Sequence, residues 1–119
     1  MQPSEIQTRT NTLSNACIKV SALLSGNQPI VESCRQELVK HASALSIQAR
    51  GLSSGQISSI FVERLNKAVD ACNGCAFWLQ LVVQEKMMDG SIIQPLISES
   101  ENLAMMFLAA LRSSKIKSE

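Results

Sequence analysis

The sequence has few aromatic residues and almost no net charge. It contains three Phe, one Trp and no Tyr, and 11 basic residues against 10 acidic ones leave a formal net charge of +1. Such a chain lacks the overall positive field that attracts nucleic acid or acidic lipid. Because aromatics are scarce, the core must consist of aliphatic, Ala, Met and Cys side chains, which suits helices better than an aromatic-rich β-sandwich.

Signals for export and membrane insertion are also missing. Residues 1–11 are polar and contain no apolar stretch typical of a signal peptide. No apolar run approaches the ~20 residues of a membrane span. We therefore expect a cytoplasmic protein without a membrane partner, in which the four Cys are reduced. With 119 residues, 45% of them hydrophobic, residues 1–119 are expected to form a single domain.

The chain does contain a regular series of helix start and stop signals. Ser-x-x-Gln sequences, typical of capping boxes, begin at Ser4, Ser53 and Ser91, and Pro29 suits the first turn of a further helix. Glycines that can terminate a helix in a left-handed conformation stand at Gly26, Gly51 and Gly90. Together these signals predict four helices, over residues 4–25, 28–50, 54–88 and 92–115.

Apolar residues recur at steps of three and four in each predicted helix, as on one buried helix face. The second helix has Val31, Cys34, Leu38, Ala42, Leu45 and Ala49, and the third has Phe61, Leu65, Ala68, Cys72, Cys75, Leu79 and Val82. Because the connections are short, neighbouring helices are expected to be antiparallel. The predicted fold is all-α, an antiparallel up-and-down four-helix bundle.

Two helices have apolar faces wider than one packing seam needs. The extra residues include Ile57, Ile60 and Trp78 on the third helix and Met105 on the fourth. A broad apolar face can be buried within a monomer, or it can be covered by another copy of the chain. Because Trp is favoured at interfaces, we expect a homo-oligomer with these four residues at its interface.

The sequence Cys72-Asn73-Gly74-Cys75 is the strongest candidate for chemistry. A C-x-x-C pair can be a redox dithiol or half of a zinc site. Both Cys fall on the predicted core stripe in mid-helix, so they are more typical of small buried hydrophobes. Gly74 costs a helix about 1 kcal/mol relative to Ala, so we expect it to permit close packing. His41, the one histidine, is expected at the boundary of the core.

No sequence pattern of an enzyme is present. The carboxylates are scattered, and there is no Glu-x-x-His pair, glycine-rich phosphate loop or G-x-S-x-G elbow. We therefore expect no catalytic residue, no metal or other cofactor, and no small-molecule substrate.

The second half of the chain resembles a known family. It reads Phe-Val-Glu-Arg-Leu-Asn-Lys-Ala over 61–68, Cys-Ala-Phe-Trp-Leu-Gln-Leu over 75–81, and Leu-Arg-Ser-Ser-Lys over 111–115. These residues resemble the bacterial four-helix-bundle proteins encoded by intervening sequences in large-subunit ribosomal RNA genes. That family also includes the accessory variability determinant of diversity-generating retroelements. Ile47-Gln48-Ala49-Arg50-Gly51 stands where the family usually has Asn-Ile-Ala-Glu-Gly.

The resemblance implies a non-enzymatic scaffold or adaptor that self-associates into a ring, often a pentamer, and binds a macromolecular partner. In the retroelement branch, a basic surface of the ring engages nucleic acid and a reverse transcriptase. The near-neutral charge of this chain departs from that branch. The alternative function is therefore a nucleic-acid-binding accessory factor, and its candidate binding residues are Arg50, Arg64, Lys67, Arg112, Lys115 and Lys117.

Overall fold

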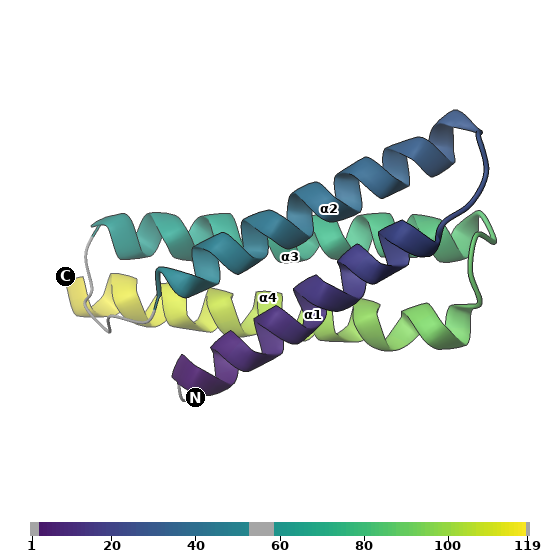
Figure 1. The fold of residues 1–119 in the computed structure, drawn as a ribbon. Helices are drawn as coiled ribbons and strands as arrows, with labels where there is room; N and C mark the ends of the chain where they lie inside the picture. Colours follow the sequence, from purple (N-terminus) through teal and green to yellow (C-terminus); the bar gives the residue numbers. More distant parts are fainter. Residues whose placement is uncertain (1–2, 53–58, 119) are drawn as a thin grey trace.

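The computed structural model contains four α-helices, and successive helices run in opposite directions (Figure 1). It describes residues 3–52 and 59–118, with side chains described over 5–52 and 59–114. The helices are α1 (Pro3–Leu23), α2 (Pro29–Arg50), α3 (Ser59–Gln84) and α4 (Gly90–Ser118). These described ranges contain no strand. The predicted all-α four-helix bundle is confirmed.

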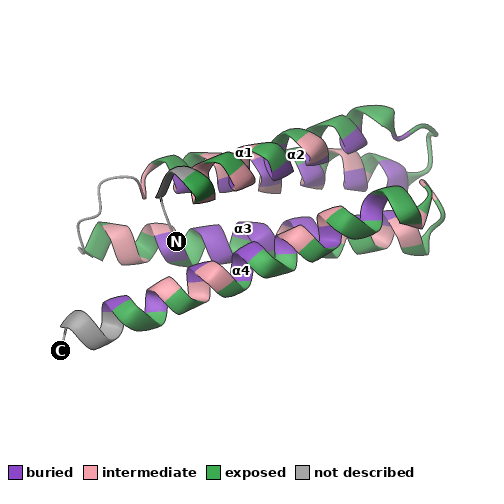
Figure 2. Ribbon diagram, turned by 90° about the horizontal axis from the view of Figure 1, so that it is seen from below, coloured by how far each residue is buried: buried purple, intermediate pink, exposed green. Residues whose placement is uncertain are grey.

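The helices form two pairs that lie one on the other. The α1–α2 pair crosses the α3–α4 pair at an incline, and the bundle measures 50 × 23 × 20 Å (Figure 1). Most residues that face the space between the pairs are buried (Figure 2). Contacts are extensive between α3 and α4, between α2 and α3, and between α1 and α2, whereas α1 touches α4 at far fewer positions. The seam between α1 and α4 is therefore the weakest of the four.

The core follows the predicted apolar stripes. All six stripe residues of α2 are buried, and so are those of α3 from Leu65 to Val82. The sequence stripes did not include two serines that join α1 to α2. Ser14 Oγ donates a hydrogen bond to the Ala42 carbonyl (3.0 Å), and Ser21 Oγ donates one to the Arg35 carbonyl (3.0 Å). Small hydroxyl side chains thus let these two helices pack closely without unsatisfied polar atoms.

The predicted helix starts are partly wrong. Pro29 begins α2 as expected, but α4 begins at Gly90, before the predicted cap residue Ser91. The side chain of Asp89 caps this helix instead, because its Oδ1 accepts hydrogen bonds from the Ser91 N–H (2.9 Å) and the Ser91 hydroxyl (3.0 Å). These bonds hold the pKa of Asp89 below its usual value. The predicted capping box at Ser53 lies outside the described residues.

The predicted helix stops are also partly wrong. Gly26 is left-handed (φ 120°), but Gly51 is right-handed (φ −73°), and Gly90 is the first residue of α4 rather than a stop. Lys86 (φ 57°) takes the left-handed position at the end of α3. Its N–H donates to the Val83 carbonyl, and the N–H of Met87 donates to the Val82 carbonyl. This pair of bonds is a Schellman motif, and it ends α3 four residues before the predicted boundary.

Candidate functional site

The described side chains form no cluster with the chemistry of a metal centre. No group of three or more His, Cys, Asp or Glu in this part of the chain is placed to hold a metal ion. Over the same residues, every buried side-chain nitrogen or oxygen has a hydrogen-bond partner. No helix in the described ranges combines the length and apolar character needed to cross a bilayer. The features left to carry function are thiols, cations and exposed apolar side chains.

Three buried thiols meet in the core of the bundle, one from α1 and two from α3. Cys72 and Cys75 of α3 are fully buried, as is Cys17 of α1. Burial raises the pKa of the Cys72 thiol to about 12. A hydrogen bond to Cys17, together with burial, raises the pKa of Cys75. A nucleophilic or redox-active Cys needs a lowered pKa and access to solvent. This geometry therefore favours the interpretation of Cys72 and Cys75 as core residues.

Gly74 lies directly beneath the imidazole of His41. A methyl group placed on Gly74 would fall 2.5 Å from Cγ and 2.6 Å from Cε1 of His41, closer than real side chains approach. The prediction that Gly74 permits close packing is confirmed, and the element that approaches is α2. His41 is half-buried, as expected of a residue at the core boundary.

The candidate cations lie toward one end of the bundle. Arg50 ends α2, Arg64 and Lys67 lie near the start of α3, and Arg112 is an exposed residue near the end of α4; these helix ends lie together at the left of Figure 1. The side chains of Lys115 and Lys117 are outside the described residues. Arg64 covers Gly51, and Lys67 pairs with Glu63 (3.0 Å), which lowers the pKa of Glu63.

No protein-family model, curated protein or solved structure matches the chain. The family resemblance seen in the sequence therefore stays a prediction.

The described candidate interface residues are spread along α3 and α4. Ile60 and Met105 are 62% and 61% exposed, Trp78 is half-buried against the core, and Ile57 is not among the described residues. Ile60 and Trp78 lie about 27 Å apart along α3, at 1.5 Å per residue. Ile60 instead lies beside Ile47 of α2, and the two line a shallow hollow of 270 Å³.

Phe77 is an exposed aromatic residue that is not among the site residues predicted from the sequence. It is 54% exposed, and its ring meets that of Trp78 edge to face, with centroids 5.2 Å apart and planes at 85°. Phe77 falls off the stripe that runs through Cys75 and Leu79, and its position directly before Trp78 is the signal that could have identified it. The two rings form an aromatic pair at the surface of α3.

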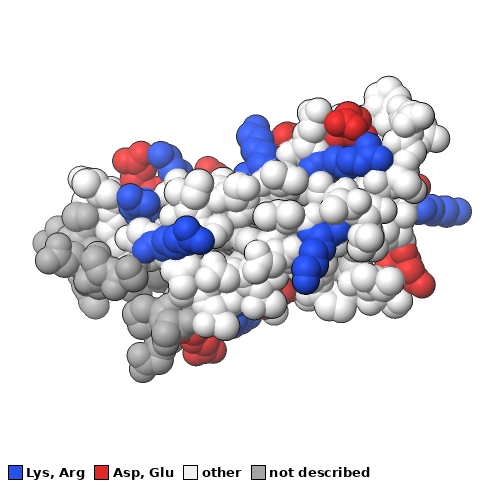
Figure 3. Space-filling view, in the orientation of Figure 1, with Lys and Arg blue, Asp and Glu red and all other residues white. Residues whose placement is uncertain are grey.

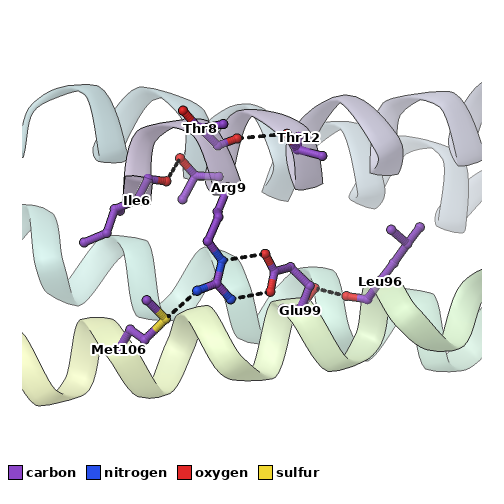
Figure 4. A network of polar contacts seen from close by, with 9 residues as sticks. Ile6, Thr8, Arg9, Thr12, Leu96, Glu99 and Met106 are labelled. Atoms are coloured by element: carbon purple, nitrogen blue, oxygen red, sulfur yellow. Dashed lines mark hydrogen bonds and ion pairs between the residues drawn. The ribbon is translucent and has the colours of Figure 1, made fainter. Parts of the chain in front are cut away.

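A group of polar contacts centred on Arg9 joins α1 to α4 (Figure 4). Arg9 of α1 donates to both carboxylate oxygens of Glu99, from Nε (2.9 Å) and from Nη2 (2.5 Å), and its Nη1 donates to Met106 Sδ (3.4 Å). The hydrogen bond from Glu99 raises the pKa of Arg9. Both side chains are about one-third exposed, and Arg9 also lines a 410 Å³ hollow beside Met105. This contact ties together the seam with the least packing.

Proposed function

We propose that the protein is a non-catalytic helical scaffold that self-associates and presents its helix surfaces to a macromolecular partner. The observation that supports this is the exposure of large apolar side chains on all four helices. Six are more than half exposed: Leu23, Ile47, Ile60, Phe77, Ile92 and Met105. Single exposed apolar residues are normal on a soluble protein. Here, however, three of the six lie in apolar pairs, Ile47 with Ile60 and Phe77 with the half-buried Trp78, which is more typical of surfaces that another chain covers.

The mass of the protein in solution tests this proposal. We expect light scattering during size-exclusion chromatography to give a multiple of the 12.9 kDa chain mass. The ring implied by the family resemblance would give one fixed multiple at every concentration. A mass of one chain over the whole accessible concentration range would contradict the proposal.

A nucleic-acid-binding function is the second candidate, and one observation favours it. Arg50, Arg64, Lys67 and Arg112 lie toward the same end of the bundle. An oligomer that brings several such ends together would multiply their charge, although each chain is nearly neutral. The partners that this function implies are RNA or DNA and, by the resemblance, a reverse transcriptase.

Salt dependence of binding tests the second candidate. We expect an RNA duplex or single strand to bind more weakly as salt rises, and Arg112→Ala to lower the slope of log Kd against log salt by about one. Lys19→Ala, which removes an exposed cation of α1, is the matched control and should leave the slope unchanged. Absence of binding, or binding that salt does not change, would contradict a nucleic-acid function.

A further inference from the structure

The sulfur of Met106 accepts a hydrogen bond from a cation of another helix. Its Sδ lies 3.4 Å from Nη1 of Arg9, which also donates to both carboxylate oxygens of Glu99 (Figure 4). Arg9 belongs to α1, whereas Met106 and Glu99 belong to α4. Because a thioether sulfur is a weak acceptor, the bond from Nη1 is weaker than the two bonds to the carboxylate.

Arg9 differs in its partners from other cations of the chain. Lys and Arg are spread over the face of the molecule that α1 and α2 form (Figure 3). Several cations pair with a carboxylate about one turn away on their own helix: Arg35 with Glu32, Lys40 with Glu37, and Lys67 with Glu63. Pairs within a helix do not join helices, whereas each bond from Arg9 to α4 holds α1 at the weakest seam of the bundle.

The Met106 side chain can be reached from solvent. It is half-buried against the core. It lines a surface hollow of 410 Å³ together with Arg9, Asn102, Met105 and Ala109. A small peroxide fits a hollow of this size, so the side chain of Met106 contacts both the guanidinium of Arg9 and a space that an oxidant can enter.

Oxidation of this sulfur would change its bond with Arg9. Hydrogen peroxide transfers one oxygen atom to a lone pair of the sulfur: the S–O bond forms as the O–O bond breaks, and water leaves. The sulfur loses two electrons, and the peroxide gains them. The product is a polar sulfoxide, and a bond from a guanidinium to its oxygen is charge-assisted and therefore strong. Because the Met side chain has three rotatable bonds, this oxygen can turn toward Nη1.

We propose that Met106 is an oxidation site and that Arg9 binds its sulfoxide, which fastens α1 to α4. The oxidant is a peroxide, and a methionine sulfoxide reductase reverses the step. Oxidation of a methionine packed on a core normally loosens a protein, because a polar group enters apolar surroundings. Here the effect has the opposite sign, because the new oxygen meets an N–H whose partner was a thioether. This inference does not require self-association of the chain.

Native-state hydrogen exchange before and after peroxide treatment tests the sign of the effect. Fragment-ion mass spectrometry first identifies the methionines that carry an added oxygen. With Met106 oxidised in the wild type, we expect the amides of α1 to exchange about fivefold more slowly, the effect of one added hydrogen bond. The amides of α3 should not change, and treatment with a methionine sulfoxide reductase should restore the original rates of α1.

Two variants separate the roles of the sulfur and its donor. Met106→Leu keeps a side chain of similar volume but removes the sulfur. Because this variant retains Met105, it controls for oxidation elsewhere, and peroxide should leave its α1 exchange unchanged. Arg9→Leu keeps Met106 but removes the donor, so oxidation should no longer slow the exchange of α1.

Each outcome supports or overturns the inference. Slower exchange that needs both Met106 and Arg9 supports it. Unchanged or faster exchange of α1 in the oxidised wild type overturns it, as does equal slowing in either variant. Oxidation of Met105 without Met106 overturns it because the sulfur is then out of reach. Protection of both methionines overturns it too, and would indicate that another chain covers the hollow, so the proposed self-association would stand.

Discussion

The contact between Gly74 and His41 explains a glycine in the middle of a 26-residue helix. Glycine there costs about 1 kcal/mol of helix stability relative to Ala. The position has no side chain because the His41 ring of α2 occupies the space that a Cβ atom would need. Glycine at this position makes α3 locally less stable but lets α2 pack more closely against it.

We expect Gly74→Ala to lower the free energy of unfolding by about 1–3 kcal/mol, because overpacking outweighs the gain in helix propensity. In a His41→Ala background the conflict is gone, so the same substitution should raise stability by up to about 1 kcal/mol. Urea unfolding of the four proteins in this double-mutant cycle measures both effects. An equal loss in both backgrounds would show that the ring is not the cause.

The buried thiols should make the protein sensitive to alkali. The pKa of Cys72 rises from 9.0 to about 12 on folding, because burial disfavours the thiolate. Below pH 9 this thiol is protonated in both states. Between these two values only the folded state keeps the proton, so stability falls as pH rises, by about 1.4 kcal/mol per unit for each such thiol.

Urea unfolding at a series of pH values above 9 measures this slope. Cys72→Ala should reduce the slope of the unfolding free energy against pH by the contribution of one proton. An unchanged slope would exclude Cys72 as a source of this pH dependence. A thiol reagent at neutral pH provides an independent measurement. All four buried Cys should react slowly until the protein is unfolded. Fast reaction at Cys72 or Cys75 in the native protein would restore the redox interpretation.

At the scale of helices, the sequence predicts the faces better than the ends. The stripe of α2 is buried at every predicted position, because burial of a repeated apolar face is a property of the whole segment. The ends depend on single residues. Gly51 and Gly90 are of the residue type that often ends a helix. However, Gly51 leaves space for the Arg64 side chain, and Gly90 is the first residue of α4. Glycine serves turns and close contacts alike, and only the fold decides which.

The candidate site shows the same limit. Periodicity places Trp78 beside the core stripe of α3, and it is half-buried there. It does not tell which of Phe77 and Trp78 faces water, because that depends on how α3 is rotated between α2 and α4. Likewise, no spacing in the sequence predicts that Arg9 of α1 meets Glu99 and Met106 of α4. That contact follows only once the two helices are known to lie side by side.

The end of α3 offers a stabilising substitution. Lys86 holds a left-handed conformation, which costs a residue with a side chain about 1–2 kcal/mol, whereas glycine adopts it freely. Lys86→Gly should therefore raise the midpoint of thermal unfolding by several degrees, as expected for about 1 kcal/mol in a domain of this size. Lys86→Ala removes the same charge but keeps the strain, so it should give no such gain. An equal rise in both variants would assign the effect to charge.

The molecule as a whole is held together unevenly. α1 packs extensively on α2, α2 on α3, and α3 on α4, whereas α4 makes few contacts with α1. Where α1 and α4 meet, a bidentate ion pair between Arg9 and Glu99 holds the two helices together in place of extensive apolar packing. Ion pairs exposed to this degree contribute little, at most about 1 kcal/mol. Segments with few packed neighbours open at lower free energy than the core.

We therefore expect α1 to open locally before the α3–α4 pair, and the Arg9–Glu99 contact to limit that opening. Native-state hydrogen exchange measures it residue by residue. Arg9→Met keeps the aliphatic stem but removes the ion pair, so amides of α1 should exchange up to about fivefold faster. Amides of α3 should not change. Glu63→Gln, which breaks the exposed pair with Lys67 inside α3, is the control and should leave α1 unaffected. If Arg9→Met instead accelerated exchange equally in all four helices, α1 would open only when the whole bundle unfolds, and the weak seam would not form a separate unit.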